Sequence, residues 1–177
     1  MLPLAKRWLS ASIMTERILN MDEISFRPLS PADVDETARV IRAAFAAQPR
    51  STKPPSSALS ETAGTVSAKI AAGGGVGAFA SGALVGAALW EIKAGALHVG
   101  RVSVVPAWRG RSLAGALIKA CESQARRRSL ARMTLRVRLE LPENERLFEH
   151  FGFERRALDA HEGSDKPTQA VMEKLLA

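Results

Sequence analysis

The sequence predicts one mixed α/β domain built on a single sheet, and three observations carry that prediction. The chain has 177 residues, of which 46% are apolar, and a domain of this length buries roughly 70% of the surface that its unfolded chain exposes. Segments with two-residue apolar alternation are interleaved with segments of three- and four-residue spacing. No internal repeat or composition boundary divides the chain. We expect residues 23–177 to form the domain and residues 1–22, which lack a periodic pattern, to be a dispensable extension.

The N-terminal elements follow from periodicity and from turn residues. An alternating segment predicts a strand over 24–29, and apolar residues three and four apart predict a helix that ends near Ala47. Three prolines and three serines within 48–57 indicate an exposed loop that is free to contact a ligand. A second helix is predicted over 59–72, with Glu61 in its first turn and glycines after its end.

The C-terminal elements complete the order β-α-α-β-β-β-α-β-α-β-β. Met133 to Leu141 alternate strictly between apolar and polar residues, which is typical of a strand with one buried face. Helical spacing of apolar residues after Leu113 places Cys121 in the core. The predicted elements are two strands within 76–92 joined at Ser81 and Gly82, a strand over 96–105, helices over 113–128 and 143–150, a strand over 133–141, and final strands over 153–158 and 170–176.

The excess positive charge is confined to one segment. The chain has a net charge of +7, and residues 101–140 carry ten basic and only two acidic side chains. Such a distribution indicates a localised anionic partner rather than a uniformly cationic surface. A nucleic acid and a phosphorylated cofactor are the two candidates.

A turn between a strand and a helix carries the chemistry of this segment. The strand stops at Pro106, a basic turn runs from Arg109 to Ser112, and Ala114 and Gly115 follow in the first turn of a helix. Small residues let an anion approach the backbone, where unpaired amides and the helix dipole favour phosphate. Arg109 and Arg111 add forked donors. An ordinary strand-turn-helix with a cationic surface fits the turn equally well.

The run RGRSLA from Arg109 to Ala114 resembles the R-x-x-G-x-G/A signature of the GNAT N-acetyltransferase superfamily. Ser112 stands where the first of the two glycines is usual, and Ala114 takes the alternative at the second. The segment NERLFEHFGF over 144–153 resembles the helix and Gly-Phe pair found later in that family. The element order over 24–176 also matches the family.

The resemblance implies a GNAT-like fold with splayed central strands and acetyl-coenzyme A as cofactor. The strand over 96–105 would part from the strand over 133–141, so that backbone groups of Ser103, Val104 and Val105 pair with the pantetheine arm. The Val104 amide would polarise the thioester carbonyl while a primary amine attacks it directly. The other implied cofactor-binding residues are Arg109, Gly110, Arg111, Ser112, Leu113, Ala114, Gly115, Asn144 and Phe148.

The catalytic acid and base are less well specified. The family often places a tyrosine acid at the position of Phe148, and this chain contains no tyrosine. His98, on the strand that leads into the turn, is the first candidate for the base, because its ordinary pKa suits the role. Glu91 is the second candidate. A strand histidine without a catalytic role is the alternative for His98.

The acceptor is expected to be a small-molecule or peptide amine. The segment over 50–62 overhangs the splayed strands in this fold, so we expect Pro55, Ser56 and Glu61 to contact the acceptor. Arg136 and Arg138 lie on the polar face of their strand and favour an acceptor with a carboxylate over a polyamine.

Two other functions are considered, and the composition predicts the metal content and the location of the protein. A non-catalytic coenzyme A-binding module stays open because the tyrosine is missing. Nucleic-acid binding is disfavoured, because 5% aromatic residues give few stacking surfaces. The scattered histidines predict no metal site. A single cysteine and no apolar run of ~20 residues predict a cytoplasmic protein outside the membrane, and a homodimer is left open.

Overall fold

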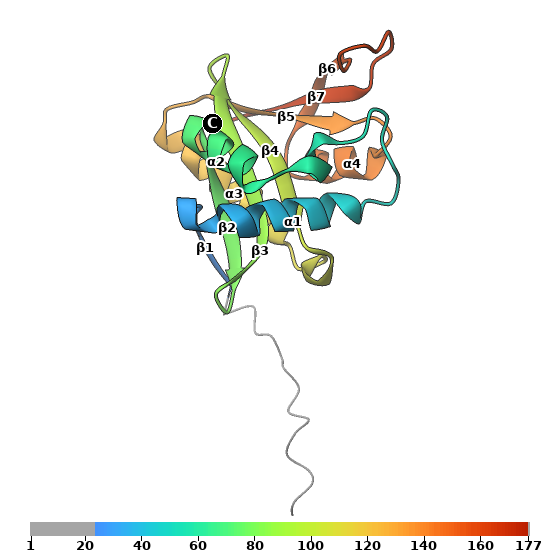
Figure 1. Ribbon diagram of the computed structural model, residues 1–177. Coiled ribbons are helices and arrows are strands. Elements are labelled where there is room, and N and C mark those ends of the chain that lie inside the picture. Colours follow the sequence, from blue (N-terminus) through green and yellow to red (C-terminus); the bar gives the residue numbers. More distant parts are fainter. Residues whose placement is uncertain (1–23, 177) are drawn as a thin grey trace, which may run out of the picture.

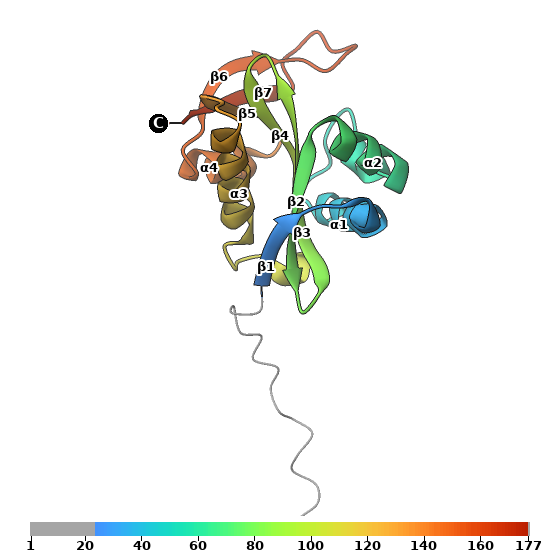
Figure 2. The same ribbon diagram turned by 90° about the vertical axis from the view of Figure 1, so that its left-hand side faces the viewer.

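The computed structural model describes residues 24–176, which form a seven-stranded sheet in the order β1-β2-β3-β4-β5-β7-β6. Helices α1 and α2 cover one face of the sheet, and α3 and α4 cover the other (Figures 1 and 2). No helix within these residues has the length and apolar content needed to cross a membrane. The elements are β1 (Ile24–Pro28), α1 (Val34–Ala46), α2 (Ala63–Ala72), β2 (Gly74–Ala80), β3 (Ala83–Lys93), β4 (Ala96–Val104), α3 (Leu113–Arg127), β5 (Arg132–Arg138), α4 (Pro142–His150), β6 (Glu154–Asp159) and β7 (Gln169–Leu175).

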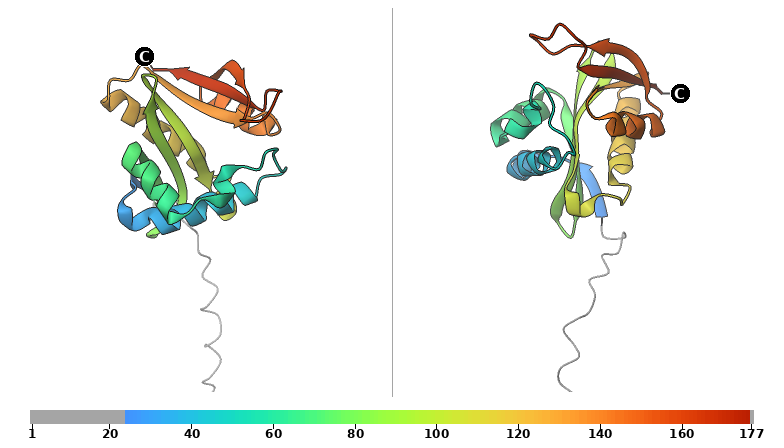
Figure 3. Two further views of the ribbon diagram at one scale, coloured as in Figure 1. Left: turned by 45° about the horizontal axis from the view of Figure 1, so that its top comes forward. Right: turned by 90° about the vertical axis from the view of Figure 1, so that its right-hand side faces the viewer.

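The sheet opens between β4 and β5. These strands are parallel and share only two residue pairs, Leu97 with Met133 and His98 with Thr134. Beyond the second pair they diverge (Figure 3), while β5 stays paired with β7 as far as Arg138. The expected mixed α/β fold with splayed central strands is confirmed.

A bulge in β4 accompanies this opening. The register between β3 and β4 shifts between Ala87 and Leu89, so that Arg101 and Val102 together stand opposite Ala88. Arg101 has a φ of 54°, in the left-handed region. A bulge bends its strand and increases the local twist, and this one lies where β4 leaves β5.

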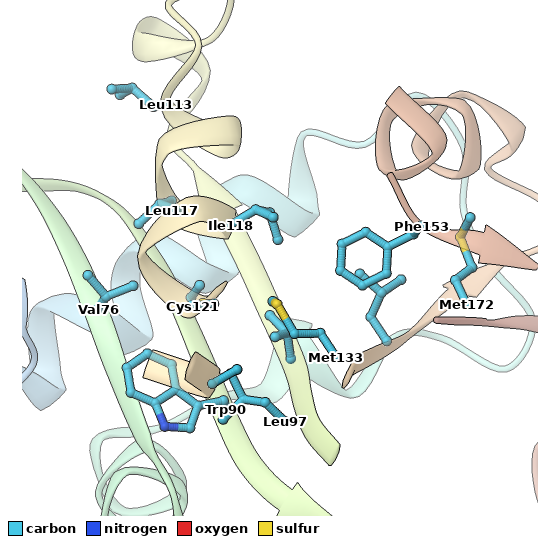
Figure 4. Close-up of a cluster of buried hydrophobic side chains, with 14 of the residues drawn as sticks. Val76, Trp90, Leu97, Leu113, Leu117, Ile118, Cys121, Met133, Phe153 and Met172 are labelled. Atoms are coloured by element: carbon cyan, nitrogen blue, oxygen red, sulfur yellow. The ribbon is translucent and has the colours of Figure 1, made fainter. Parts of the chain in front are cut away.

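The main core lies between the sheet and α3. Leu117, Ile118 and Cys121 pack against Leu97 and Met133 from the central strands (Figure 4). Cys121 is fully buried, and burial raises the pKa of its thiol to about 12. Cys121 is therefore a packing residue, as the helical spacing predicted.

Two predicted boundaries are corrected. The helix predicted over 59–72 is divided into a 3₁₀ turn, Ser57–Ser60, and α2, which begins after Thr62. Thr62 and Thr65 form a capping box there, so Glu61 lies before the helix rather than in its first turn.

The strand predicted over 133–141 ends at Arg138, because α4 begins at Pro142 and the intervening residues turn. The Leu139 amide in that turn donates to the Thr168 carbonyl. The predicted extension over 1–22 lies outside the described residues.

The join between α2 and β2 yields a test of the fold. A Cβ atom on Gly73 would stand 1.8 Å from the Trp90 carbonyl oxygen, whereas on Gly64 in the same helix the nearest atom, Thr62 Oγ1, is 3.8 Å away. Gly73→Ala should lower the free energy of unfolding by at least about 2 kcal/mol. Gly64→Ala should raise it by about 0.5 kcal/mol, because alanine is the better helix former. Urea unfolding of both variants measures these changes, and a shift of the same sign in both would contradict this account.

Candidate active site

A cavity of about 630 Å³ lies where β4 and β5 part. Its walls come from β4, β5, the beginning of α3 and the length of α4. It brings together most of the predicted binding residues from distant parts of the chain. Those that line it are Ser56, Val104, Arg109, Gly110, Ser112, Leu113, Ala114, Gly115, Arg136, Arg138, Asn144 and Phe148.

The N-terminus of α3 presents free backbone amides to this cavity. Gly110 and Ser112 have φ values of 73° and 59°, and the first intrahelical bond runs from the Ala116 amide to the Ser112 carbonyl. The amides of residues 113–115 precede that bond, and they lie at the positive end of the helix dipole. This arrangement fits a phosphate group, as the turn predicted.

The edge of β4 facing the gap is open at Val104. The Val105 amide donates to the Val85 carbonyl at 3.0 Å. Antiparallel pairs alternate between bonded and non-bonded positions, so the amide and carbonyl of Val104 point away from β3 and into the gap. Arg109 Nε donates to that carbonyl at 3.3 Å.

The neighbours of Val104 are placed differently from the expectation. By the same alternation the amides of Ser103 and Val105 face β3 and are used within the sheet. The Ser103 hydroxyl is buried and donates to the Arg101 carbonyl. Of the three predicted backbone contacts, Val104 is therefore the one that the geometry leaves available.

The two arginines of the turn do not converge on one anion. The Arg109 guanidinium donates to the carbonyls of Ala44 at 2.7 Å and Ala47 at 3.1 Å, at the C-terminus of α1. Arg111 stacks over the Trp108 ring at 4.6 Å and is outside the cavity lining. The structure thus corrects their predicted role: Arg109 joins α1 to the turn, and the free donors at this end of the cavity are backbone amides.

Helix α4 supplies an aromatic wall. Phe148 lines the cavity and packs edge-on against Phe151 and Phe153, with ring centroids 6.4 and 6.0 Å away. A Cβ atom on Gly115 would lie 3.0 Å from the Phe151 ring, so glycine permits α3 to approach this wall closely. Sequence reasoning missed Phe151 and assigned Gly115 to the cofactor alone.

Both candidate bases lie in a second hollow, of about 510 Å³, between α2 and the β3–β4 pair. His98 and Glu91 are opposite each other in the register of these strands. The two hollows share Gly100 and Arg101 as lining residues. No atom lies within 4 Å of where a Gly100 Cβ would stand, so side-chain volume is missing at the point where the hollows meet.

The surroundings of His98 favour its neutral form over the imidazolium. Its Nδ1 lies 3.0 Å from the Thr134 hydroxyl. Burial lowers the pKa of His98, and the positive charge of Arg136 lowers it further, against an opposing effect of Glu91. In the tautomer whose Nδ1 proton is donated to Thr134, Nε2 carries the lone pair that a base needs.

Glu61 is an internal ion-pair partner rather than a residue of the cavity wall. Its side chain is 2% exposed and lies 2.6 Å from Arg101 Nε and 2.8 Å from Lys69 Nζ. Burial favours the neutral acid, but hydrogen bonds from Lys69, Thr65 and Arg101 outweigh it and lower the pKa of Glu61. Pro55 likewise does not line the cavity, whereas its neighbour Ser56 does.

Three structural comparisons show that the fold is shared with solved proteins, two of which are N-acetyltransferases. PaiA N-acetyltransferase from Thermoplasma acidophilum, solved with coenzyme A, aligns with a TM-score of 0.70 and 18% identity over 86% of this chain and 99% of its own. Ard1 from Thermoplasma volcanium gives 0.71 and 18% over 88% and 99%. The ribosomal-protein alanine N-acetyltransferase from Escherichia coli gives 0.68 and 16% over 86% and 93%.

The sequence itself settles the family. A search of curated proteins found no match. The profile described as the acetyltransferase (GNAT) family matches residues 40–153, which are more than half of the chain. The chain therefore belongs to the GNAT acetyltransferase family.

Proposed function

We propose that the protein transfers the acetyl group of acetyl-coenzyme A to a primary amine by direct attack. The observation that carries this function is one cavity that joins the free amides of α3 to the open edge of β4 at Val104. Family membership supports acetyl-coenzyme A as the donor, which supplies the thioester that the amine attacks.

The residues of the cavity bind and orient more than they react. The amides of residues 113–115 would hold phosphate oxygens of the coenzyme at the helix terminus. The Val104 amide would donate to the thioester oxygen, where negative charge develops during attack. Holding both partners in this geometry is itself a large part of the rate enhancement.

The proton of the amine leaves through the second hollow. We assign its removal to His98, through a chain of water molecules that would run from the gap at Val104 past Gly100 into the second hollow. Support for this role comes from the place of His98 in the hollow that shares Gly100 with the main cavity, and from its lowered pKa. Glu91, exposed at the rim of the same hollow, is the second candidate.

An amine panel with thiol detection tests the function. Release of coenzyme A that depends on one amine establishes the enzyme, and calorimetry with coenzyme A measures binding separately. Binding without turnover on any amine would favour the non-catalytic module. Absence of both would remove the proposal.

The N-terminus of α3 yields a prediction for cofactor binding. Ala114→Glu should weaken coenzyme A binding by more than about tenfold, because a carboxylate there repels phosphate. The fold should survive, since an acid in the first turn of a helix is favourable. Ala114→Gln has nearly the same size without the charge and should bind at least severalfold more tightly than the glutamate variant. Equal affinities in the two variants, measured by calorimetry, would contradict the site.

The pKa of His98 yields a prediction for pH. The neutral form is the base, so kcat/KM should rise with pH through one group below the ordinary histidine value of about 6.5 and then level off. His98→Gln should lose about a hundredfold in kcat together with this rise. Thr134→Val keeps the imidazole and should retain the rise. An unchanged profile in His98→Gln would exclude His98.

The missing tyrosine can be restored. Phe148→Tyr should leave coenzyme A affinity unchanged and increase kcat if protonation of the departing thiolate limits the rate. Pre-steady-state thiol release distinguishes this step from product release. A lower kcat with intact binding would show that the hydroxyl disturbs the aromatic wall instead.

A further inference from the structure

Cationic side chains dominate the lining of the main cavity. Four arginines line it, and the carboxylate among its lining residues is that of Glu143, which lies 3.0 Å from Arg50. The cavity therefore offers no uncommitted negative charge to an acceptor. The arginines are Arg101, Arg109, Arg136 and Arg138.

Three of these guanidinium groups are occupied within the protein. Arg101 is paired with buried Glu61, and Arg109 donates to the carbonyls at the end of α1. Arg138 uses Nε for Glu140 at 3.4 Å, Nη2 for the Pro54 carbonyl at 2.6 Å and Nη1 for the His161 ring. These contacts leave these three groups few directions for a ligand.

Arg136 differs because only one of its edges is used. Its Nε donates to Asp159 Oδ2 at 3.1 Å, and no acceptor among residues 24–176 contacts Nη1 or Nη2. Asp159 is itself fixed by the Ala160 amide at 2.9 Å and by Gln169 Nε2 at 3.2 Å. Arg136 is thus oriented on the Nε side, while its terminal edge, the pair of Nη atoms, is free.

Arg136 stands across the gap from Gly100 and lines the main cavity. His98 and Thr134 form the last residue pair between β4 and β5. Gly100 lies two residues beyond His98 on β4, and Arg136 lies two residues beyond Thr134 on β5. Two residues of strand span about 7 Å. Arg136 and Gly100 therefore stand on opposite sides of the gap, on one face of the sheet.

We propose that the acceptor is an amine that also carries a carboxylate, and that the terminal edge of Arg136 binds this carboxylate while the amine extends along the gap toward Val104. This inference rests on the proposed acetyl transfer. Two parallel N–H donors match the two oxygens of a carboxylate in geometry and charge. Arg136 would then determine specificity, and Asp159 would be a positioning residue.

A second cation on the acceptor would be placed unfavourably. A diamine or polyamine would bring its distal ammonium beside Arg136 and Arg138, and Glu143 is already committed to Arg50. Like charges at this distance repel, although solvent at the exposed Arg136 side chain screens part of the repulsion. The same positive charge favours the neutral, attacking form of the bound amine, as it favours neutral His98.

Matched acceptors test the inference on the full-length protein. Glycine, 3-aminopropanoate and 4-aminobutanoate are each compared with their primary amides and with 1,4-diaminobutane. For the best chain length, kcat/KM should be at least about tenfold higher for the acid than for its amide. In Arg136→Gln this ratio should fall to within about threefold. Arg132→Gln removes the same charge from the same strand outside the cavity lining and should keep the ratio.

Calorimetry of the acids and amides, with the protein saturated by coenzyme A, provides a readout that does not depend on turnover. The acids should bind more tightly than the amides, and Arg136→Gln should abolish this difference; that outcome would support the inference. If in addition no amine were acetylated, only the proposed acetyl transfer would be rejected. Turnover of amides or diamines at rates equal to or above those of the acids would overturn the inference and leave the acetyl transfer standing. Equal or undetectable binding of acids and amides would overturn it as well, as would a preference for acids that persists in Arg136→Gln.

Discussion

The unpaired edge of β4 is the constraint on which the rest of this structure depends. Backbone amides and carbonyls need partners, and the strand pair between β4 and β5 ends after His98 and Thr134. Val104 is left facing a gap within the sheet rather than another strand. Such an edge is a ready site for an extended ligand, because a ligand can complete the missing ladder.

The loop over residues 48–56 is bound to the end of β5 and to α4 beside the gap. In the loop over residues 48–56, the Lys53 amide donates to Glu140 Oε1 at 2.9 Å, and the Pro54 carbonyl accepts from Arg138 at 2.6 Å. Arg50 lies 3.0 Å from Glu143 at the start of α4. These contacts join the loop that follows α1 to the end of β5 and the start of α4, beside the cavity.

Local sequence patterns predicted the elements but not their partners. Period-two and period-three-to-four spacing located elements with one buried face, such as α1, α3 and β5, and the turn signal at Ser81 and Gly82 separated β2 from β3, which are buried on both faces. The separation of β4 from β5 was predicted from the resemblance of the turn after Pro106 to a family signature. Hydrophobic periodicity could not predict it, because periodicity does not encode the distance between strands.

Contacts between residues far apart in the sequence explain the errors. Arg109 was expected to bind an anion, but its partners at Ala44 and Ala47 lie more than 60 residues earlier. Glu61 was expected at the acceptor, but it pairs with Arg101 across 40 residues. The sequence around Arg109 or Glu61 does not indicate its partner, because an arginine or glutamate that forms such a pair has the same local sequence features as one exposed to solvent. Strict alternation along β4 would place His98, Gly100, Val102 and Val104 on one face. The structure keeps only His98 and Gly100 together, because the bulge at Arg101 and Val102 adds one residue and moves Val102 and Val104 to the opposite face.

The arginines show why residue type alone does not define a site. Arg101, Arg109 and Arg136 all line one cavity, yet the first balances a buried carboxylate and the second a helix terminus. The carboxylate of Glu61 and the carbonyls of Ala44 and Ala47 thus occupy donors of Arg101 and Arg109 that a ligand would otherwise use. What distinguishes Arg136 is that Asp159 occupies its Nε side and leaves the paired terminal donors unused. A guanidinium with one satisfied edge is both oriented and available, whereas an unpaired one would have to lose side-chain entropy on binding. An arginine in this cavity can therefore bind an acceptor only where its guanidinium keeps N–H donors that no protein acceptor occupies, and the number of arginines in the lining does not decide this.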